Sequence, residues 1–188
     1  MGASTGNLLV DDNDALEQIF AESPVLIVTH CEDTPMIDKN LEAAKLKYDG
    51  EIPISEHPAI RSVDACYKSS SKAVSLAKKH GSKLHVLHLT TAKEMELFET
   101  GDHKKNITAE VCVHHLYFND SSYDQLGSKM VCNPAIKTRA DQIALINALK
   151  EDRIDIIATD HAPHTSEEKA KPYPNCPSGI PLVPHSLL

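Results

Sequence analysis

The chain has 188 residues, of which 41% are apolar, enough for a hydrophobic core. Its formal net charge is −8 and it has no long basic run, which argues against nucleic acid or an acidic membrane as the main partner. Five widely spaced cysteines contain no Cys-x-x-Cys pair, a pattern typical of reduced thiols in the cytosol. No signal peptide or membrane-spanning run is found, so we expect a cytoplasmic protein.

The first predicted elements are a helix and a buried strand. Apolar spacing indicates a helix over 12–22, in which Asp14 and Glu17 match a capping box. Pro24 ends it. Residues 25–29 form a continuous apolar run without alternation, which predicts a strand covered on both faces.

Two helices are expected next. Thr34 can cap the first of them, with Pro35 at its first position, and this helix gives out near Gly50. The second is predicted over 62–80, and Gly81 stops it.

The second half of the chain repeats the alternation. Its predicted elements are a strand over 84–89, a short helix over 92–100, a strand over 107–113, a helix over 139–152 and a strand over 154–159. Alternating strands and helices imply a parallel sheet with right-handed crossovers. A (β/α)8 barrel and an open α/β sheet both place their sites at the carboxyl ends of strands, and pattern alone does not choose between them.

Three strand ends carry candidate metal ligands. His30 follows the first strand, His88 the second and Asp160 the fourth. Imidazole nitrogen and carboxylate oxygen both suit zinc. One histidine at a strand end is as easily a core imidazole bonded to backbone as a ligand, but three such positions in register favour a site.

The other histidines and Cys31 receive simpler interpretations. His85 and His88 on one strand should point to opposite faces, and His114 and His115 share this ambiguity. Cys31 is interpreted as a small packing residue. The remaining histidines are interpreted as ordinary loop or helix-end residues: His57, His80, His103 and His185.

Five segments together resemble the dihydroorotase family of the amidohydrolase superfamily, in family order. They are THCED (29–33), LHLTTAKE (87–94), ITAEVCVHHL (107–116), NPAIK (133–137) and ATDHAPH (158–164), the last followed five residues later by Lys169. The resemblance is to the bacterial type I enzymes. These reversibly close N-carbamoyl-L-aspartate into dihydroorotate, in pyrimidine biosynthesis.

The resemblance implies an α/β fold of parallel (β/α) units, namely strands 5–8 of a metal-dependent TIM barrel. Residues 1–188 would then be a partial catalytic domain, with the N-terminal half-barrel and the flanking β-sandwich absent. The family's His-x-His after the first barrel strand is missing, as is the carboxylated Lys or Asp that bridges two metals on the fourth strand.

The family pattern assigns roles to the three candidate ligands. It implies that His30 and His88 hold one of two zinc ions. Asp160 would hold the other and act as catalytic base, handing the proton on to the leaving amide nitrogen. Zinc would polarise the amide carbonyl and lower the pKa of water, and a carboxylate would shuttle the proton.

The resemblance also implies a pocket for a small substrate. Asn133 and His164 match positions that hold its carboxylate and ring, and Gly179 lies where the family's pocket-lining loop follows the eighth strand. Asn is also a common turn residue before a proline such as Pro134.

Three nearby cations have plainer interpretations. Lys137 and Arg139 are interpreted as surface charge at a helix start, although they could meet an acidic substrate. Lys169 is interpreted as a structural part of the signature.

Two alternatives stay open. One is another cyclic amidohydrolase, such as a hydantoinase or allantoinase, in which the position of His164 tends to carry something else. The other is a non-catalytic dihydroorotase homologue that binds aspartate transcarbamoylase. Because the ligand set is incomplete, we expect weak or absent zinc binding and little activity from this chain alone. Uncovered sheet edges would favour a homo-oligomer.

Overall fold

Four parallel strands form one sheet in chain order, β1-β2-β3-β4. The computed structural model describes residues 10, 12–101 and 105–186. The strands are β1 (Ile27–Thr29), β2 (Leu84–Val86), β3 (Ile107–Cys112) and β4 (Ile156–Ala158). Ile27 pairs with Leu84, and Leu84 pairs with Ile107. The predicted α/β class with a parallel sheet is confirmed, although all four strands are shorter than expected.

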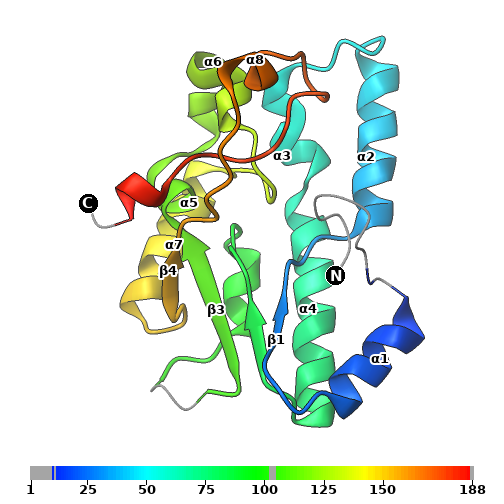
Figure 1. Ribbon diagram of the computed structural model, residues 1–188, viewed down its shortest axis with the longest axis vertical. Helices are drawn as coiled ribbons and strands as arrows, with labels where there is room; N and C mark the ends of the chain where they lie inside the picture. Colours follow the sequence, from blue (N-terminus) through cyan, green and yellow to red (C-terminus); the bar gives the residue numbers. More distant parts are fainter. Residues whose placement is uncertain (1–9, 11, 102–104, 187–188) are drawn as a thin grey trace.

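Helices, some of which cover one side of the sheet, connect these strands (Figure 1). They are α1 (Asn13–Glu22), α2 (Thr34–Lys47), α3 (His57–Ile60), α4 (Val63–His80), α5 (Val113–Tyr117), α6 (Tyr123–Leu126), α7 (Arg139–Lys150) and α8 (Ser166–Lys169). The short helix predicted over 92–100 is instead a 3₁₀ turn over Lys93–Leu97. None of the described helices is long and apolar enough to cross a membrane.

Two helix caps differ from the sequence-based expectation by one or two residues. The side chain of Asp12, not Asp14, accepts the backbone N–H of Ala15 at the start of α1. The side chain of Asp33 caps α2 in place of Thr34, because it accepts the backbone N–H three residues on. Carboxylates at these positions also complement the positive end of the helix dipole.

The main core lies between the sheet and the helices. Leu84 and Val86 of β2, with Ala109 and Val111 of β3, are fully buried against α1, α4 and α7. Burial of each large aliphatic side chain contributes about 1.5–3 kcal/mol. This layer fixes the strand positions and therefore the positions of the residues at their ends.

The edge strands are not covered on both faces, which corrects the expectation for 25–29. Val28 of β1 is 53% exposed and Ile156 of β4 is 48% exposed. In the register of the sheet, Val28 aligns with His85, on the face away from the helices. The described residues supply one helical layer, so apolar side chains on the other face and at the edges stay open to solvent. A continuous apolar run indicates a strand that can be buried on both faces, but it does not show whether the chain supplies helices for both.

The carboxyl ends of all four strands lie at the same end of the sheet, called the carboxyl edge below (Figure 1). After β4 the chain crosses this edge, where His161 forms a parallel bridge with Ile180 and Gly179 N–H donates to Val131 O at 2.9 Å. The candidate ligands all follow strands at this edge.

Candidate metal centre

His30 and His88 meet at the carboxyl edge of the sheet. His30 follows β1 directly, and His88 lies two residues after β2. The His30 Nδ1 and His88 Nε2 atoms are 3.0 Å apart, and the two rings are nearly perpendicular at 74°. Two residues 58 positions apart therefore present ring nitrogens to one point. The parallel pairing of β1 with β2 produces this approach.

A buried carboxylate orients the His30 ring. Glu32 Oε2 lies 3.0 Å from His30 Nε2, on the side of the ring opposite His88, and Glu32 also pairs with Arg61. Burial alone would raise the pKa of Glu32, but the Arg61 guanidinium and the His30 hydrogen bond outweigh it and hold that pKa at about 2. A carboxylate on the far nitrogen is the usual support of a metal-binding imidazole, since it fixes ring direction and raises basicity.

His88 is buried and stays neutral at neutral pH. Burial is the main cause that lowers its pKa to about 3, and the nearby His30 contributes to this shift. A neutral imidazole keeps a lone pair for a metal, whereas an imidazolium has none.

Asp160 lies at the same edge, two residues after β4. Partial desolvation raises the pKa of its carboxyl; His30 opposes this shift and Glu110 adds to it. Asp160 and His88 both have positive backbone φ, +44° and +36°. Such φ values are uncommon outside glycine and concentrate at functional positions.

The three candidate ligands do not close into a tight set. Within the described ranges, one grouping brings three potential ligand atoms within 4.8 Å of one another, and it contains neither His30, His88 nor Asp160. The structure thus brings the two imidazoles together, with Asp160 near enough to His30 for their charges to interact. The metal-ligand roles of all three stay predictions.

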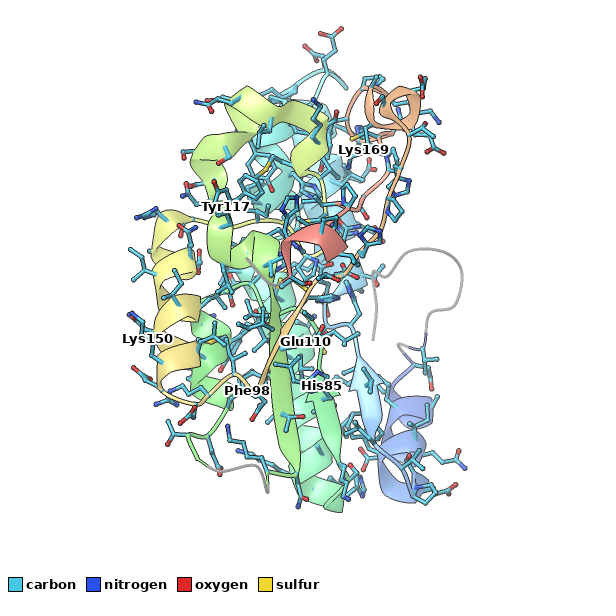
Figure 2. All side chains as sticks on the ribbon, turned by 60° about the vertical axis from the view of Figure 1, so that its left-hand side comes forward. His85, Phe98, Glu110, Tyr117, Lys150 and Lys169 are labelled. Atoms are coloured by element: carbon cyan, nitrogen blue, oxygen red, sulfur yellow. The ribbon has the colours of Figure 1, made fainter. Side chains whose placement is uncertain are left out.

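A second polar network lies beside this pair and was not singled out from the sequence. His85 Nε2 is 3.1 Å from Glu110 Oε2, and Glu110 Oε1 accepts the backbone N–H of His88 at 3.4 Å. His85 and Glu110 project from neighbouring strands β2 and β3 (Figure 2). Glu110 therefore ties the sheet face to the backbone of His88. The available signal was a glutamate in the middle of a largely apolar strand.

Asn133 lines a cavity of about 300 Å³. Its Oδ1 is buried without a hydrogen-bond partner among the described residues. Arg61 and His57 also line this cavity, which is otherwise mostly apolar. An unsatisfied amide oxygen in a cavity that an arginine also lines suits a polar ligand, because a buried polar atom without a partner is costly. The predicted substrate role of Asn133 fits this position but stays a prediction.

His164 and Gly179 do not line that cavity. His164 is exposed, and its Nε2 donates to Ser178 O at 2.9 Å. Gly179 is buried with φ +136°, and a Cβ there would lie 2.6 Å from the backbone oxygen of Ala162. The close approach of the Ala162 backbone therefore explains why a glycine is needed at this position, and no bound ligand has to be invoked. The substrate roles expected for both residues also stay predictions.

Two expectations for polar side chains were wrong. Lys137, expected at the surface, is buried, and its Nζ donates to Ala135 O at 2.9 Å. His57, expected in an ordinary loop or helix end, is also buried, where its Nε2 donates to Cys132 O and its Nδ1 accepts from the Tyr173 hydroxyl. In both cases the partner is remote or carries no sequence signal.

Two other interpretations agree with the contacts. Lys169 donates to Val131 O and Pro177 O, as its structural interpretation requires. Cys31 packs in the main core.

Comparison with curated proteins shows that the chain is similar to dihydroorotases. The chain is 30% identical over 178 residues to the dihydroorotase of Methanosphaera stadtmanae, 93% of this chain and 41% of the relative. It is 32% identical over 187 residues to that of Halobacterium salinarum and 37% over 166 residues to that of Brevibacillus brevis.

The chain is a dihydroorotase relative. It spans about two fifths of the length of these curated relatives: 41%, 42% and 38%. No family model matches it.

Solved structures of a hydantoinase and a dihydroorotase share the fold of this dihydroorotase relative. An L-hydantoinase from Arthrobacter aurescens superposes with a TM-score of 0.84 at 22% identity, over 95% of this chain and 41% of that one. A dihydroorotase from Saccharomyces cerevisiae, in complex with 5-fluoroorotic acid, gives a TM-score of 0.56 over 63% of this chain and 34% of that one, at 19% identity. The four-stranded parallel sheet and its helices therefore correspond in fold to part of these enzymes.

Proposed function

We propose that this chain supplies strands 5–8 and the metal-holding histidine pair of a dihydroorotase-type cyclic amidohydrolase. The observation that carries the proposal is the convergence of His30 and His88 at one strand edge, with Glu32 supporting the His30 ring. Identity of 30–37% to curated dihydroorotases supports dihydroorotate and N-carbamoyl-L-aspartate as the substrate pair.

The donor geometry fits zinc. Tetrahedral zinc with Zn–N distances of about 2.0–2.1 Å separates two ligand nitrogens by about 3.3 Å. His30 Nδ1 and His88 Nε2 are 3.0 Å apart and can diverge slightly to accept the ion. His30 and His88 would hold one zinc ion and Asp160 a second. Bound zinc would polarise the amide carbonyl of the substrate and make water nucleophilic at neutral pH.

The side chains of this chain would carry the proton and orient the substrate. The Asp160 carboxylate would take a proton from the attacking water and return it to the departing amide nitrogen. Asn133, whose buried Oδ1 has no hydrogen-bond partner among the described residues, would bind the ring or carboxylate of the substrate, and His164 would contact the substrate from outside the Asn133 cavity. Gly179 would hold the loop that carries Ser178 against Ala162.

This chain alone should bind zinc weakly at this centre and show little turnover. Two imidazoles on one ion and one carboxylate on the other fall below the three protein ligands that catalytic zinc usually has. The missing donors would come from a preceding half-barrel.

A chimera tests the proposal in a complete site. The segment of the Brevibacillus brevis dihydroorotase that matches this chain is replaced by the chain, and hydrolysis of dihydroorotate is compared with hydrolysis of hydantoin. We expect turnover of dihydroorotate, with little of hydantoin.

Two variants of the chimera test whether its activity depends on the proposed metal site. His88→Ala should abolish the activity, whereas His80→Gln should retain it, because His80 pairs with Glu17 away from the strand ends. A folded, zinc-loaded chimera without dihydroorotate turnover would contradict the proposal. Preference for hydantoin would favour a hydantoinase, and inactivity with every substrate would favour a non-catalytic homologue.

A further inference from the structure

A second cluster of metal-ligand side chains lies where β3 runs into α5. Cys112 is the last residue of β3 and the N-terminal cap residue of α5, which contains His114 and His115. One ligand atom from each of these three residues lies within 4.8 Å of the other two. Among the described residues, no other group of three potential metal ligands is this close together. All three side chains are buried.

The histidine nitrogens in this cluster lack the partners that a core imidazole needs. Both ring nitrogens of His114 are buried without a hydrogen-bond partner among the described residues, and the side chain is 2% exposed. Buried polar groups are rarely left in this state. A bound ligand would explain it.

His115 is already oriented for ligation. Its Nε2 lies 3.1 Å from Pro134 O, and a carbonyl can only accept, so Nε2 carries the proton. Nδ1 then carries a lone pair, and it too is buried without a partner among the described residues. A backbone carbonyl on the far nitrogen is the arrangement that fixes the tautomer of a metal-bound histidine.

We propose that Cys112, His114 and His115 form a separate zinc site at the carboxyl end of β3. One thiolate and two imidazoles match the borderline-soft character of zinc and leave its fourth position open. Tetrahedral zinc separates its nitrogen and sulfur donors by about 3.3–3.6 Å, so movements of ~1 Å close the cluster around the ion. The site does not depend on the proposed amidohydrolase function, which requires no sulfur ligand.

Cobalt, a spectroscopic substitute for zinc, provides the first test. Titration of the purified chain with Co²⁺ should produce a thiolate-to-cobalt charge-transfer band in the near ultraviolet. Cys112→Ser should abolish this band, while Cys66→Ser should retain it. The two cysteines are matched, since both are fully buried at 0% exposure, and Cys66 belongs to no such cluster within the described residues.

Two further measurements complete the test. The first distinguishes this site from the His30–His88 centre, and the second uses the unmodified chain. The double variant His30→Ala/His88→Ala should retain the charge-transfer band. X-ray absorption of the zinc-loaded unmodified chain should show one sulfur at about 2.3 Å with nitrogen donors at about 2.0–2.1 Å. Absence of bound cobalt, persistence of the band in Cys112→Ser, or a zinc shell of nitrogen and oxygen alone would overturn the proposal. None of these results would alter the dihydroorotate assay of the chimera.

Discussion

Asp160 is the residue on which the proposed proton transfer depends. Asp160→Asn in the chimera keeps the shape of the side chain and removes its basicity. We expect kcat to fall by about 10²–10⁴-fold. Steady-state kinetics with dihydroorotate check this, with His161→Gln as the adjacent control, since His161 Nδ1 accepts the backbone N–H of Val183. A kcat within a few-fold of the parent chimera would exclude Asp160 as the base.

The buried His57 side chain should make the folded chain less stable in acid. Burial lowers its pKa to about 3, from 6.5 in the unfolded chain, so unfolding favours proton uptake. Its contribution to stability is complete above pH 6.5 and declines as the pH falls towards 3. Over this window the unfolding free energy of the parent chain should fall by about 1.4 kcal/mol per pH unit more than that of His57→Gln. Urea unfolding at several pH values measures both slopes, and equal slopes would contradict the assignment.

At the scale of single elements, the loop at Gly179 is set by contact between backbones. Gly179→Ala should destabilise the chain by about 3 kcal/mol, because the new Cβ would lie 2.6 Å from Ala162 at φ +136°. Gly101→Ala is a matched control, with φ +138° but no atom within 4 Å of its Cβ, and should cost about 1 kcal/mol. Thermal unfolding compares the two variants. A similar cost for both would show that backbone conformation, not the contact, requires glycine at Gly179.

The sequence predicted the order of elements and the strand ends that carry polar chemistry. Apolar runs ending at His30 or Asp160, and helix stops such as Gly81, are local signals that survive in the fold. The pair of Glu32 with Arg61 and the burial of Lys137 could not be predicted this way, since their partners lie far away or in backbone. The cluster at Cys112 was missed for a different reason: its donors are close in sequence, but the turn from β3 into α5 that brings them together was not predicted.

At the scale of the whole molecule, the sheet has apolar edges open to solvent. Val28 of β1 and Ile157 of β4 are 53% and 54% exposed. Exposed edge strands with apolar side chains tend to pair with other chains. We expect this chain to self-associate as its concentration rises, and Val28→Lys to weaken the association. Sedimentation velocity measures both, and a parent chain that stays monomeric at high concentration would contradict the expectation.

The central claim is that His30, His88 and Asp160 hold zinc at one edge of the sheet. Anomalous diffraction at the zinc edge, from crystals of the chimera grown with zinc, tests it most directly. The claim predicts one zinc peak about 2.1 Å from ring nitrogens of both His30 and His88, and a neighbouring peak on the Asp160 carboxylate. Zinc bound elsewhere, with no peak beside the His30–His88 pair, would contradict it.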